Sequence, residues 1–394
     1  MKKPTVIHKS TPDAKVENHL RKIRTKCGLS QNDLARRVGI TRQAVYSMEM
    51  NHYLPGTGVA LHLAQTLGCS VEDLFHLGLE GEIIEADLVG EVPKNLSKVR
   101  TKVAWVGNRI IARPVAALGG LLNFTVPADG LILGAMRRRD TSTNRHATRI
   151  YVQLLREQSA VKEQVVVAGC DPAIYLAGEH VRRRGGHASV VGWAMGSVSA
   201  LRALKRKEVH VAGMHIVDPG SGLYNLPYLK KHLKGDSVTV VRFAAWEQGL
   251  LFKRGNPKGI GEIGDLARKD VRIVNREKGA GARILLDYRL SAHHIPHQVV
   301  RGYNHVVFSH LDVSRLISEG KADVGIGVRS TARLFDLDFM PLQEERYDLV
   351  IPTAYLSLHP GMIQFLDTLV TRAFRTEVEA LGGYDTREIG KIVN

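Results

Sequence analysis

Three glycine-containing loops carry residues that are suited to holding a small anion. They are Gly169-Cys-Asp171, Gly196-Ser197 and the stretch 275–283, which reads Asn-Arg-Glu-Lys-Gly-Ala-Gly-Ala-Arg. Glycine lets backbone N–H groups approach a ligand, and a helix that begins after such a loop adds partial positive charge. Arginine side chains donate paired hydrogen bonds to oxyanions and carboxylates. The candidate ligand-binding residues in these loops are Asp171, Gly196, Ser197, Arg276, Gly279, Ala280, Gly281 and Arg283.

Each of these loops, taken alone, also has a purely structural interpretation. Gly-Ser before a helix is a common cap, Asp171 beside Pro172 suits a helix N-terminus, and Arg283 could lie on the surface. The long loop is not a P-loop, because it lacks the Gly-Lys-Ser/Thr that such loops contain. It is the combination of the three loops that predicts an anion site.

Residues 29–49 have the pattern of two short helices joined by a tight turn. Ser30 and Asp33 predict an N-cap with its capping-box partner at the start of the first helix. Gly39 predicts a turn with positive φ, and Thr41 predicts the cap of the second helix. The apolar residues that are spaced to pack the two helices together are Leu34, Val38, Ile40, Val45 and Met48.

The second of these helices has the residue types that read base edges. Arginine can contact a guanine and glutamine an adenine in the major groove of DNA. Gln31, at the start of the first helix, is placed to contact a phosphate together with backbone N–H groups. A plain helical hairpin is the structural alternative. The candidate DNA-binding residues are Gln31, Thr41, Arg42, Gln43, Tyr46 and Ser47.

The net charge and the cysteine content restrict the environment and the partners of the chain. The 394 residues carry a formal net charge of +16, which favours a polyanionic partner or serves only solubility. None of the three cysteines lies in a CxxC pair, so we expect neither a zinc site nor disulfides, and we expect Cys27 and Cys69 to be buried. The N-terminus has no apolar signal segment, and the chain has no 18-residue apolar run. We therefore expect a cytoplasmic protein without a membrane span.

The periodicity of apolar residues divides the chain into three segments: residues 1–78, 79–158 and 159–394. The first reads as short helices. The second reads as a small β-rich module with strands at Val103–Val106, Arg109–Ile111 and Leu131–Leu133, and with a helix-like piece from Ala147 to Glu157. The third alternates strands with helices, which is typical of an α/β domain with mostly parallel strands. Its expected strands are Val165–Ala168, Ser189–Val191, Val209–Ala212, Val238–Phe243, Leu250–Phe252, Val271–Val274, Asp323–Val328 and Asp348–Ile351.

Residues 16–77 resemble the Cro/lambda-repressor (XRE) family of helix-turn-helix domains. The resemblance implies five helices, an operator in double-stranded DNA and a homodimer that binds two half-sites. Tyr46 departs from the family, where a small polar residue is more common. The residues that carry the resemblance are Leu20–Arg24, Gly28–Gln31, Leu34-Ala35, Met48-Glu49, Pro55, Leu61–Leu67 and Val71–Phe75.

Residues 163–355 resemble the periplasmic-binding-protein-like domain of the molybdate-binding type. That domain also occurs fused to helix-turn-helix domains and at the C-terminus of some MoeA-type molybdenum-cofactor proteins. The resemblance implies a type II fold with two α/β lobes and a ligand cleft between them. The residues that carry it are Gly196-Ser197, Ala200–Leu204, Ala212–Asp218, Tyr224–Tyr228, Glu247–Leu250, Gly255–Lys258, Asp265–Ala267, Asn275–Asp287, Gly302-Tyr303, Ala322–Gly327, Leu337–Phe339, Pro341-Leu342 and Glu345–Leu349.

Two positions depart from the pattern of this second family. Ala282 stands where a hydroxyl residue usually precedes the loop arginine, and Trp246 stands where an arginine usually precedes Glu-Gln-Gly-Leu. The expected ligand is therefore either an oxyanion such as molybdate or tungstate, or a small organic acid; the alternative is that the cleft has lost its ligand and only scaffolds the dimer. His215 and Asp218 either line the cleft or form a buried structural pair.

Together these features predict a transcriptional regulator that responds to a small anion. The alternative is a molybdenum-cofactor enzyme or binding protein with a DNA-binding appendage, although no segment matches the catalytic domains of MoeA. A transport receptor is disfavoured by the missing signal segment. We find no catalytic constellation, so we expect no enzymatic activity, no cofactor and no metal. The histidines that we expect on the surface rather than in a metal site are His180, His187, His215, His293, His294 and His297.

Overall fold

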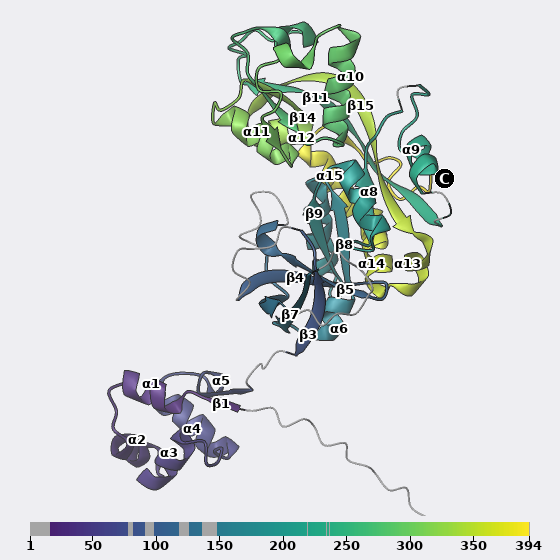
Figure 1. Cartoon of the computed structure of the whole chain (residues 1–394). Coiled ribbons are helices and arrows are strands. Elements are labelled where there is room, and N and C mark those ends of the chain that lie inside the picture. Colours follow the sequence, from purple (N-terminus) through teal and green to yellow (C-terminus); the bar gives the residue numbers. More distant parts are fainter. Residues whose placement is uncertain are drawn as a thin grey trace, which may run out of the picture. The chain divides into compact units, whose positions relative to one another are not determined.

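The computed structural model of the chain divides into two compact units, residues 1–81 and 82–394 (Figure 1). The boundary that we expected after residue 78 lies outside the described residues, and the one after residue 158 lies within the second unit. The structure describes residues 16–77, 82–90, 98–117, 126–135, 148–218, 220–233, 235 and 237–393.

The first unit contains the five expected helices around one apolar core. Strand β1 (Val16–Asn18) pairs antiparallel with β2 (Phe75–Leu77), which joins the two ends of the unit. Leu34, Val45 and Met48 are buried in this core. The helices are α1 (Leu20–Lys26), α2 (Gln31–Val38), α3 (Arg42–Glu49), α4 (Thr57–Leu67) and α5 (Val71–Leu74).

The predicted caps of α2 and α3 are confirmed. The Ser30 hydroxyl accepts from the Asp33 N–H at 3.1 Å, and the Asp33 carboxylate accepts from the Ser30 N–H at 3.2 Å. Gly39 ends α2 with a φ of 76°, and the Thr41 hydroxyl accepts from the Ala44 N–H. The expectation of a buried Cys27 is wrong, because this residue ends α1 at the surface of the unit.

The second segment forms a closed barrel with the strand order β3-β5-β4-β6-β7. The expected strands are confirmed and extended, but the expected helix at 147–157 is wrong. Ile150, Val152 and Leu154 point into the barrel at every second position, and their strand pairs with both β3 and β6 to close it. The strands are β3 (Ile83–Leu88), β4 (Val99–Val106), β5 (Arg109–Pro114), β6 (Gly130–Ala135) and β7 (Thr148–Leu154).

The third segment has two α/β lobes. In lobe 1 the strands β10 (Val211–Met214), β8 (Gln164–Gly169) and β9 (Ser189–Ala194) are parallel. In lobe 2 the strands β13 (Val306–Val307), β12 (Ile273–Arg276) and β14 (Val324–Val328) are also parallel. The helices that carry the rest of this segment are α6 (Gln158–Lys162), α7 (Ala173–Arg183), α8 (Ser197–Lys205), α9 (Leu226–His232), α10 (Gly281–Ala292), α11 (His310–Ser318), α12 (Arg329–Leu334), α13 (Thr353–Leu358), α14 (Pro360–Leu369) and α15 (Arg372–Leu381).

Two long strands connect the lobes. β11 (Val238–Lys253) and β15 (Leu337–Pro352) are 16 residues each and pair antiparallel along their whole length. β15 also pairs with β10 of lobe 1, and β11 pairs with β14 of lobe 2 and with the short β16 (Tyr384–Asp385). The two strand pieces expected at 238–243 and 250–252 are therefore parts of one strand, which Figure 1 shows beside β15.

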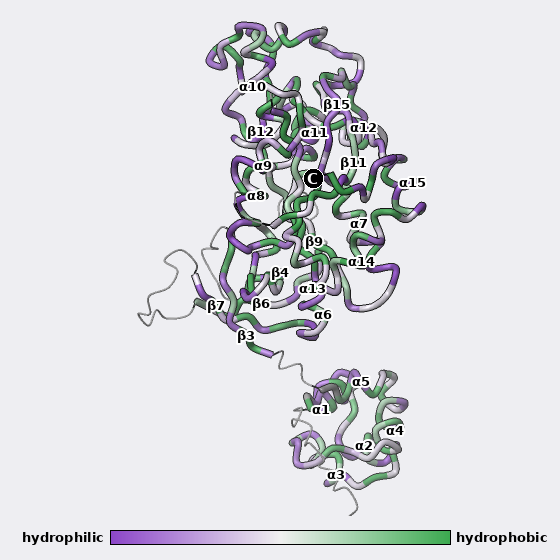
Figure 2. Tube along the Cα trace, turned by 90° about the vertical axis from the view of Figure 1, so that its right-hand side faces the viewer, coloured by the Kyte–Doolittle hydropathy of each residue, from purple (hydrophilic) through white to green (hydrophobic). Residues whose placement is uncertain are grey.

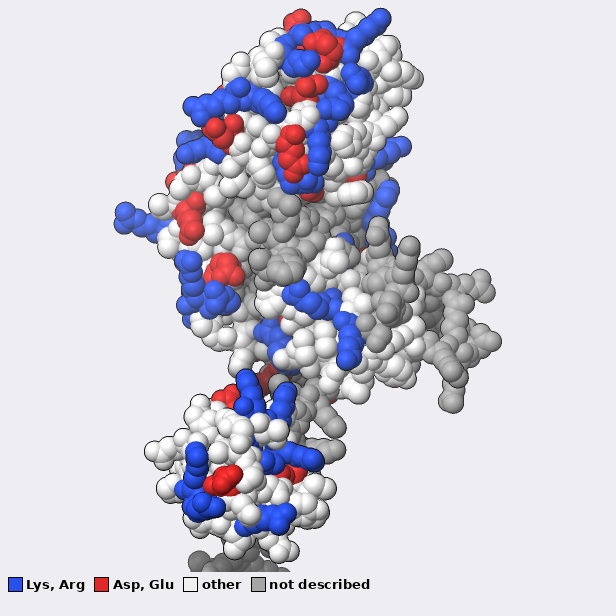
Figure 3. Space-filling view, turned by 90° about the vertical axis from the view of Figure 1, so that its left-hand side faces the viewer, with Lys and Arg blue, Asp and Glu red and all other residues white. Residues whose placement is uncertain are grey.

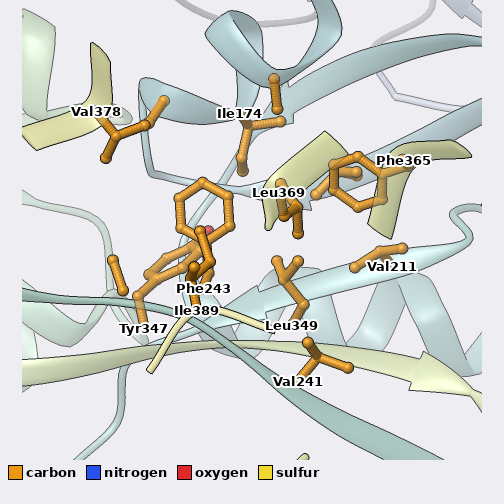
Figure 4. Close-up of a cluster of buried hydrophobic side chains, with 14 of the residues drawn as sticks. Ile174, Val211, Val241, Phe243, Tyr347, Leu349, Phe365, Leu369, Val378 and Ile389 are labelled. Carbon is orange, nitrogen blue, oxygen red and sulfur yellow. The ribbon is translucent and has the colours of Figure 1, made fainter. Parts of the chain in front are cut away.

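Apolar side chains fill the layer between the helices and the sheet of lobe 1. Figure 4 shows Ile174, Phe365 and Leu369 facing Val211 and Leu349. In Figure 2 the tube is hydrophobic over much of β9 and α14, which belong to this layer. Burial of this kind is the main favourable term that holds the lobe together.

The barrel packs directly against lobe 1 through apolar and polar contacts. Ala104 and Val106 of the barrel share a core with Val166 and Trp193 of the lobe. The Val166 N–H donates to Nδ1 of His210, whose Nε2 lies 2.8 Å from the carbonyl oxygen of Trp105. Burial lowers the pKa of His210 to about 3, so the ring is neutral and Nε2 is the donor.

A buried carboxylate organises the junction of barrel and lobe. Asp129 accepts from Lys102 at 2.7 Å, from Arg156 at 3.1 Å and from the Gln164 amide at 2.9 Å. The side chains of Asp129 and Lys102 are 1% and 6% exposed. Such a pair contributes little compared with an apolar pair, but removing one partner leaves the other charge uncompensated.

We expect Asp129→Ala to lower the free energy of unfolding of the second unit by about 3–5 kcal/mol, because Lys102 loses its buried counter-ion. Urea unfolding followed by tryptophan fluorescence measures this unit alone, since Trp105, Trp193 and Trp246 are the three tryptophans of the chain. Glu85→Ala, which removes an exposed pair with Arg149, is the control and should cost less than about 1 kcal/mol. Equal losses in the two variants would contradict the assignment.

Candidate functional site

The first unit exposes the residues that we expected to read DNA. Arg42 and Gln43 are exposed in the first turn of α3, and Tyr46 is exposed one turn later, with Ser47 half-buried beside it. Thr41 is exposed, although its hydroxyl is engaged in capping the helix. Figure 3 shows Lys and Arg side chains on the visible face of this unit. The arrangement presents the N-terminal half of α3 to a partner.

Gln31 has a role in the fold that the sequence did not indicate. Its amide donates to the Glu49 carboxylate at 2.8 Å, and the same carboxylate accepts from Arg24 at 2.5 Å. Arg24 also donates to the Leu29 carbonyl oxygen. Because Glu49 ends α3, this network fixes the angle between α1, α2 and α3. Arg24 and Glu49 are missing from the sequence-based site, since only the fold brings them together.

In the second unit, a set of buried polar side chains lies where the two lobes meet. We call it the interlobe cluster. Lobe 1 contributes residues that follow β8 and β10, lobe 2 contributes the end of β12 and the starts of α11 and α12, and the connecting strands contribute the rest. The members are Cys170, Asp171, His215, Trp246, Arg276, His310, Ser330, Glu345 and Tyr347.

The predicted loops meet across the two lobes and pack on each other. The Val198 N–H donates to the Gly279 carbonyl oxygen at 3.3 Å. A Cβ at Gly196 would lie 2.8 Å from Cα of Ala280, and a Cβ at Gly281 would lie 2.3 Å from Cε1 of His215. These glycines are therefore required for direct contact between the loops.

Ser197 and His215 are joined within this contact. Both are buried, and the Ser197 hydroxyl accepts from the His215 N–H at 3.2 Å. The expected pair of His215 with Asp218 does not form, because Asp218 accepts instead from the backbone and hydroxyl of Ser221.

The two candidate arginines lie in different surroundings. Arg276 is 1% exposed; its Nε and Nη2 donate to Glu277, and Nη2 also donates to the Phe308 carbonyl oxygen. Its Nη1 has no hydrogen-bond partner among the described residues. Arg283 donates to Asp287 on its own helix and stacks on Tyr303 at 4.1 Å. It reaches the cluster only through a 3.3 Å hydrogen bond to the Arg276 carbonyl oxygen.

A Cys–His–Glu arrangement lies at the centre of the cluster. The Cys170 sulfur is 3.2 Å from Nε2 of His215, and Nδ1 of His215 is 2.5 Å from a Glu345 oxygen. Burial disfavours charge on this ring, but the Cys170 sulfur and the Glu345 carboxylate together raise the pKa of His215 to about 10. His215 is therefore protonated, and because it is buried the expectation that it lies on the surface is wrong. The separations of 45 and 130 residues explain why no sequence pattern indicated this arrangement.

The cluster concentrates buried polar atoms that lack a hydrogen-bond partner within the described part of the chain. The donors are Nε1 of Trp246, Nη1 of Arg276 and the hydroxyls of Ser330 and Tyr347, with both ring nitrogens of His310 beside them. Each such atom costs roughly 1–3 kcal/mol. Native proteins contain few of them, so their concentration in one place indicates a binding site.

Asp171 and Glu345 are the acidic members of the cluster, and Asp171 lies beside these donors. Its Oδ1 accepts from the Tyr384 hydroxyl at 2.6 Å and from the Ala173 N–H, whereas Oδ2 has no partner in the described residues. Burial raises the pKa of Asp171 to about 6. Burial also lowers the pKa of His310 well below its usual value, with Arg276 and His215 adding to the effect, so the His310 ring is neutral. The cluster therefore carries a surplus of donors, while its two positive groups are each paired with a carboxylate, His215 with Glu345 and Arg276 with Glu277.

No helix within the described ranges is long and apolar enough to cross a membrane. A model of the helix-turn-helix family matches residues 20–74, and a model described as a PBP superfamily domain matches residues 178–370.

Proteins from bacteria and archaea resemble the chain over one part or the other. The uncharacterized protein YvgK of Bacillus subtilis is 34% identical over 198 residues, which are 50% of this chain and 63% of that protein. An uncharacterized HTH-type transcriptional regulator of Methanothermobacter thermautotrophicus is 40% identical over 63 residues, which are 16% of this chain and 91% of that protein. A putative phosphate transporter substrate-binding protein from Clostridium perfringens, solved with bound phosphate, covers 58% of this chain and 100% of its own at 13% identity and a TM-score of 0.43.

The sequence matches agree with the fold in both units. The helix-turn-helix model covers α1 to α5, and the PBP model covers most of the two lobes and both connecting strands. The chain belongs to the helix-turn-helix family, and it joins a domain of that family to a domain of the PBP superfamily.

Proposed function

We propose that this protein is a cytoplasmic transcriptional regulator whose first unit binds an operator in double-stranded DNA and whose second unit binds a small anion between its lobes. The observation that carries the proposal is the concentration of unpaired buried donors in the interlobe cluster of a protein with a helix-turn-helix domain. The regulation would be a change of DNA binding when the anion holds the lobes closed.

The exposed half of α3 supports the DNA-binding half of the proposal. Arg42 and Gln43 would contact a guanine and an adenine, with Tyr46 and Ser47 alongside. Thr41 and Gln31 lie where the N-termini of the two helices would approach phosphates. Since one such unit reads only one half-site, we propose that the protein binds DNA as a homodimer with half-sites about 34 Å apart.

The unpaired donor groups of the cluster support an anionic ligand. Nη1 of the Arg276 guanidinium is unpaired within the described residues although its other nitrogens bind Glu277, and Trp246, Tyr347 and Ser330 each offer a further unpaired donor there. We propose that Arg276 contacts the anion directly and that Arg283 acts through the Arg276 carbonyl oxygen. The wall around them would be formed by Asp171, Gly196, Ser197, His215, Gly279, Ala280 and Gly281.

The composition of this site is compatible with two kinds of ligand. A molybdate- or tungstate-like oxyanion has acceptors on all sides, which suits donors that converge from both lobes and from the connecting strands. A small organic acid has its acceptors at the carboxylate end, and that carboxylate would accept hydrogen bonds from Arg276. Asp171, if protonated, would add a donor to either one.

For the DNA-binding half, we expect the double variant Arg42→Ala, Gln43→Ala to lose sequence discrimination. Each bidentate base contact is worth about 1–3 kcal/mol, so affinity for the operator should fall at least tenfold while binding to unrelated DNA changes less. The measurement is a titration at fixed salt with a duplex that the parent protein has selected from a random pool.

A matched control removes one glutamine and one arginine side chain outside α3. Gln65 on α4 and Arg182 on α7 are both exposed, so Gln65→Ala, Arg182→Ala changes the net charge equally. This control should bind the selected duplex like the parent. If the α3 variant also binds it like the parent, α3 is not the recognition helix.

For the ligand-binding half, we expect Trp246→Phe to weaken the binding of an anion at least tenfold. A hydrogen bond to a charged group contributes about 1.5–3 kcal/mol, and phenylalanine removes the N–H donor together with part of the ring packing, a loss that the Trp193→Phe control shares. A thermal-shift panel of molybdate, tungstate, sulfate, phosphate and small carboxylic acids finds the ligand, and calorimetry gives its affinity.

Trp193→Phe is the control for this experiment. Trp193 is also buried and its Nε1 also lacks a partner within the described residues, but it lies in the core between barrel and lobe 1. It should leave the affinity unchanged, whereas Arg276→Ala should abolish binding and Arg283→Ala should weaken it less. An anion that binds Trp246→Phe as tightly as the parent would place the site elsewhere.

A further inference from the structure

Three metal-ligating side chains of the interlobe cluster lie close together. The Cys170 sulfur and one ring nitrogen each of His215 and His310 are all within 4.8 Å of one another. The side chains are buried, with residue exposures of 5%, 1% and 0%. The Cys170 sulfur and the unpartnered nitrogens of His310 can bind an ion directly, and His215 would bind one through Nε2 after releasing the proton from that nitrogen.

His215 is oriented as a metal ligand would be. Its Nδ1 is 2.5 Å from Glu345, which leaves Nε2 facing the Cys170 sulfur at 3.2 Å. Glu345 is 1% exposed. When the Gln248 side-chain amide is oriented with its nitrogen toward Glu345, it donates to the Glu345 carboxylate at 2.9 Å. Metal-bound histidines commonly pair their second ring nitrogen with a carboxylate in this way.

His310 supplies an independent observation. Neither of its ring nitrogens has a hydrogen-bond partner in the described portion of the chain, although the side chain is fully buried. It is the first residue of α11, and the Ser309 hydroxyl caps this helix by accepting from the Asp312 N–H. The backbone of His310 is thus fixed, and an imidazole without a partner is held beside a thiol and a second imidazole.

The donor set selects the kind of ion. One thiolate and two imidazoles suit Zn²⁺ or Cu⁺, whereas Mg²⁺ and Ca²⁺ prefer oxygen ligands. With metal–sulfur and metal–nitrogen distances near 2.3 and 2.0 Å, tetrahedral ligand atoms lie about 3.5 Å apart. The separations here, from 3.2 Å to at most 4.8 Å, bracket that value, so small side-chain rotations would complete the site.

We propose that Cys170, His215 and His310 bind one Zn²⁺ or Cu⁺ ion, with Glu345 positioning His215. Cys170 and His215 follow strands of lobe 1, and His310 begins a helix of lobe 2, so the ion would link the two lobes. Bound metal would then stabilise the closed arrangement by itself. The proposal does not rest on the anion, because Cys170 and His310 are not among the groups proposed to bind it, and His215 is the one ligand that the two sites share.

The test is metal binding by the full chain after treatment with a chelator, in the absence of DNA and of added oxyanions. Co²⁺ reports thiolate ligation by a charge-transfer absorption band, and competition with colorimetric chelators gives the affinities for Zn²⁺ and, under reducing conditions, for Cu⁺. We expect one ion per chain. Glu345→Gln should weaken binding 10- to 100-fold, and Cys170→Ser and His310→Gln should weaken it further, with the cobalt band lost in Cys170→Ser.

Cys69→Ser is the matched control, since this half-buried cysteine belongs to the first unit and should have no effect. Circular dichroism of each variant shows whether it folds, and His310→Gln provides a second ligand variant if Cys170→Ser does not. No stoichiometric uptake of either ion by the parent, or equal affinities in the parent and in the folded ligand variants, would overturn the proposal. Either result leaves the anion and DNA measurements unaffected, so the two proposals fail separately.

Discussion

The second unit depends on the pairing of β11 with β15 over their full length. This ladder runs from Val238 opposite Pro352 to Lys253 opposite Leu337 and is shared by the sheets of both lobes. The parallel strands of each lobe end beside its middle, where Trp246 lies opposite Glu345. Because the ladder is continuous, the two lobes cannot separate without bending it. Its two register shifts, between Arg242 and Ala244 and between Gln248 and Gly249, flank the pair and are the natural places for such a bend.

The closed arrangement of the lobes combines close packing with a costly set of buried polar groups. Gly196 and Gly281 allow the loops of the two lobes to touch without side chains between them. The same contact removes Arg276, His310 and Trp246 from water without supplying all of their hydrogen bonds. A ligand that paired these groups would bind this arrangement of the lobes better than one in which they are apart, which is the differential binding that the proposed switch requires.

The first unit depends on a different constraint, the Glu49 carboxylate at the end of α3. It accepts from Arg24 of α1 and from Gln31 of α2, and it is nearly buried. These contacts hold the exposed face of α3 at a fixed angle to α2, as reading a DNA groove demands. The exposed residues Arg42, Gln43 and Tyr46 therefore share one helix whose packing on α1 and α2 is fixed.

Local features of this chain could be predicted from the sequence because they depend on neighbouring residues. The caps formed by Ser30 with Asp33 and by Thr41, and the positive φ of Gly39, follow from side-chain chemistry within one turn. The loop at 275–283 and its approach to Gly196 were expected from glycine content and from the family resemblance. By contrast, the helix expected at 147–157 was wrong although Ile150, Val152 and Leu154 alternate as in a strand, and the structure adds that this strand pairs with both β3 and β6 to close the barrel.

The sequence by itself determined the two kinds of domain and the residue types at each site, because caps, turns and strand periodicity are local. Only the tertiary structure decided which of those residues act together. It turned Arg283 toward Asp287, held Arg276 in the cluster with one donor that no described residue pairs, and brought Cys170, His215 and Glu345 together. The reason is that contacts across a ladder of two 16-residue strands join residues far apart in the chain, and no local pattern records them.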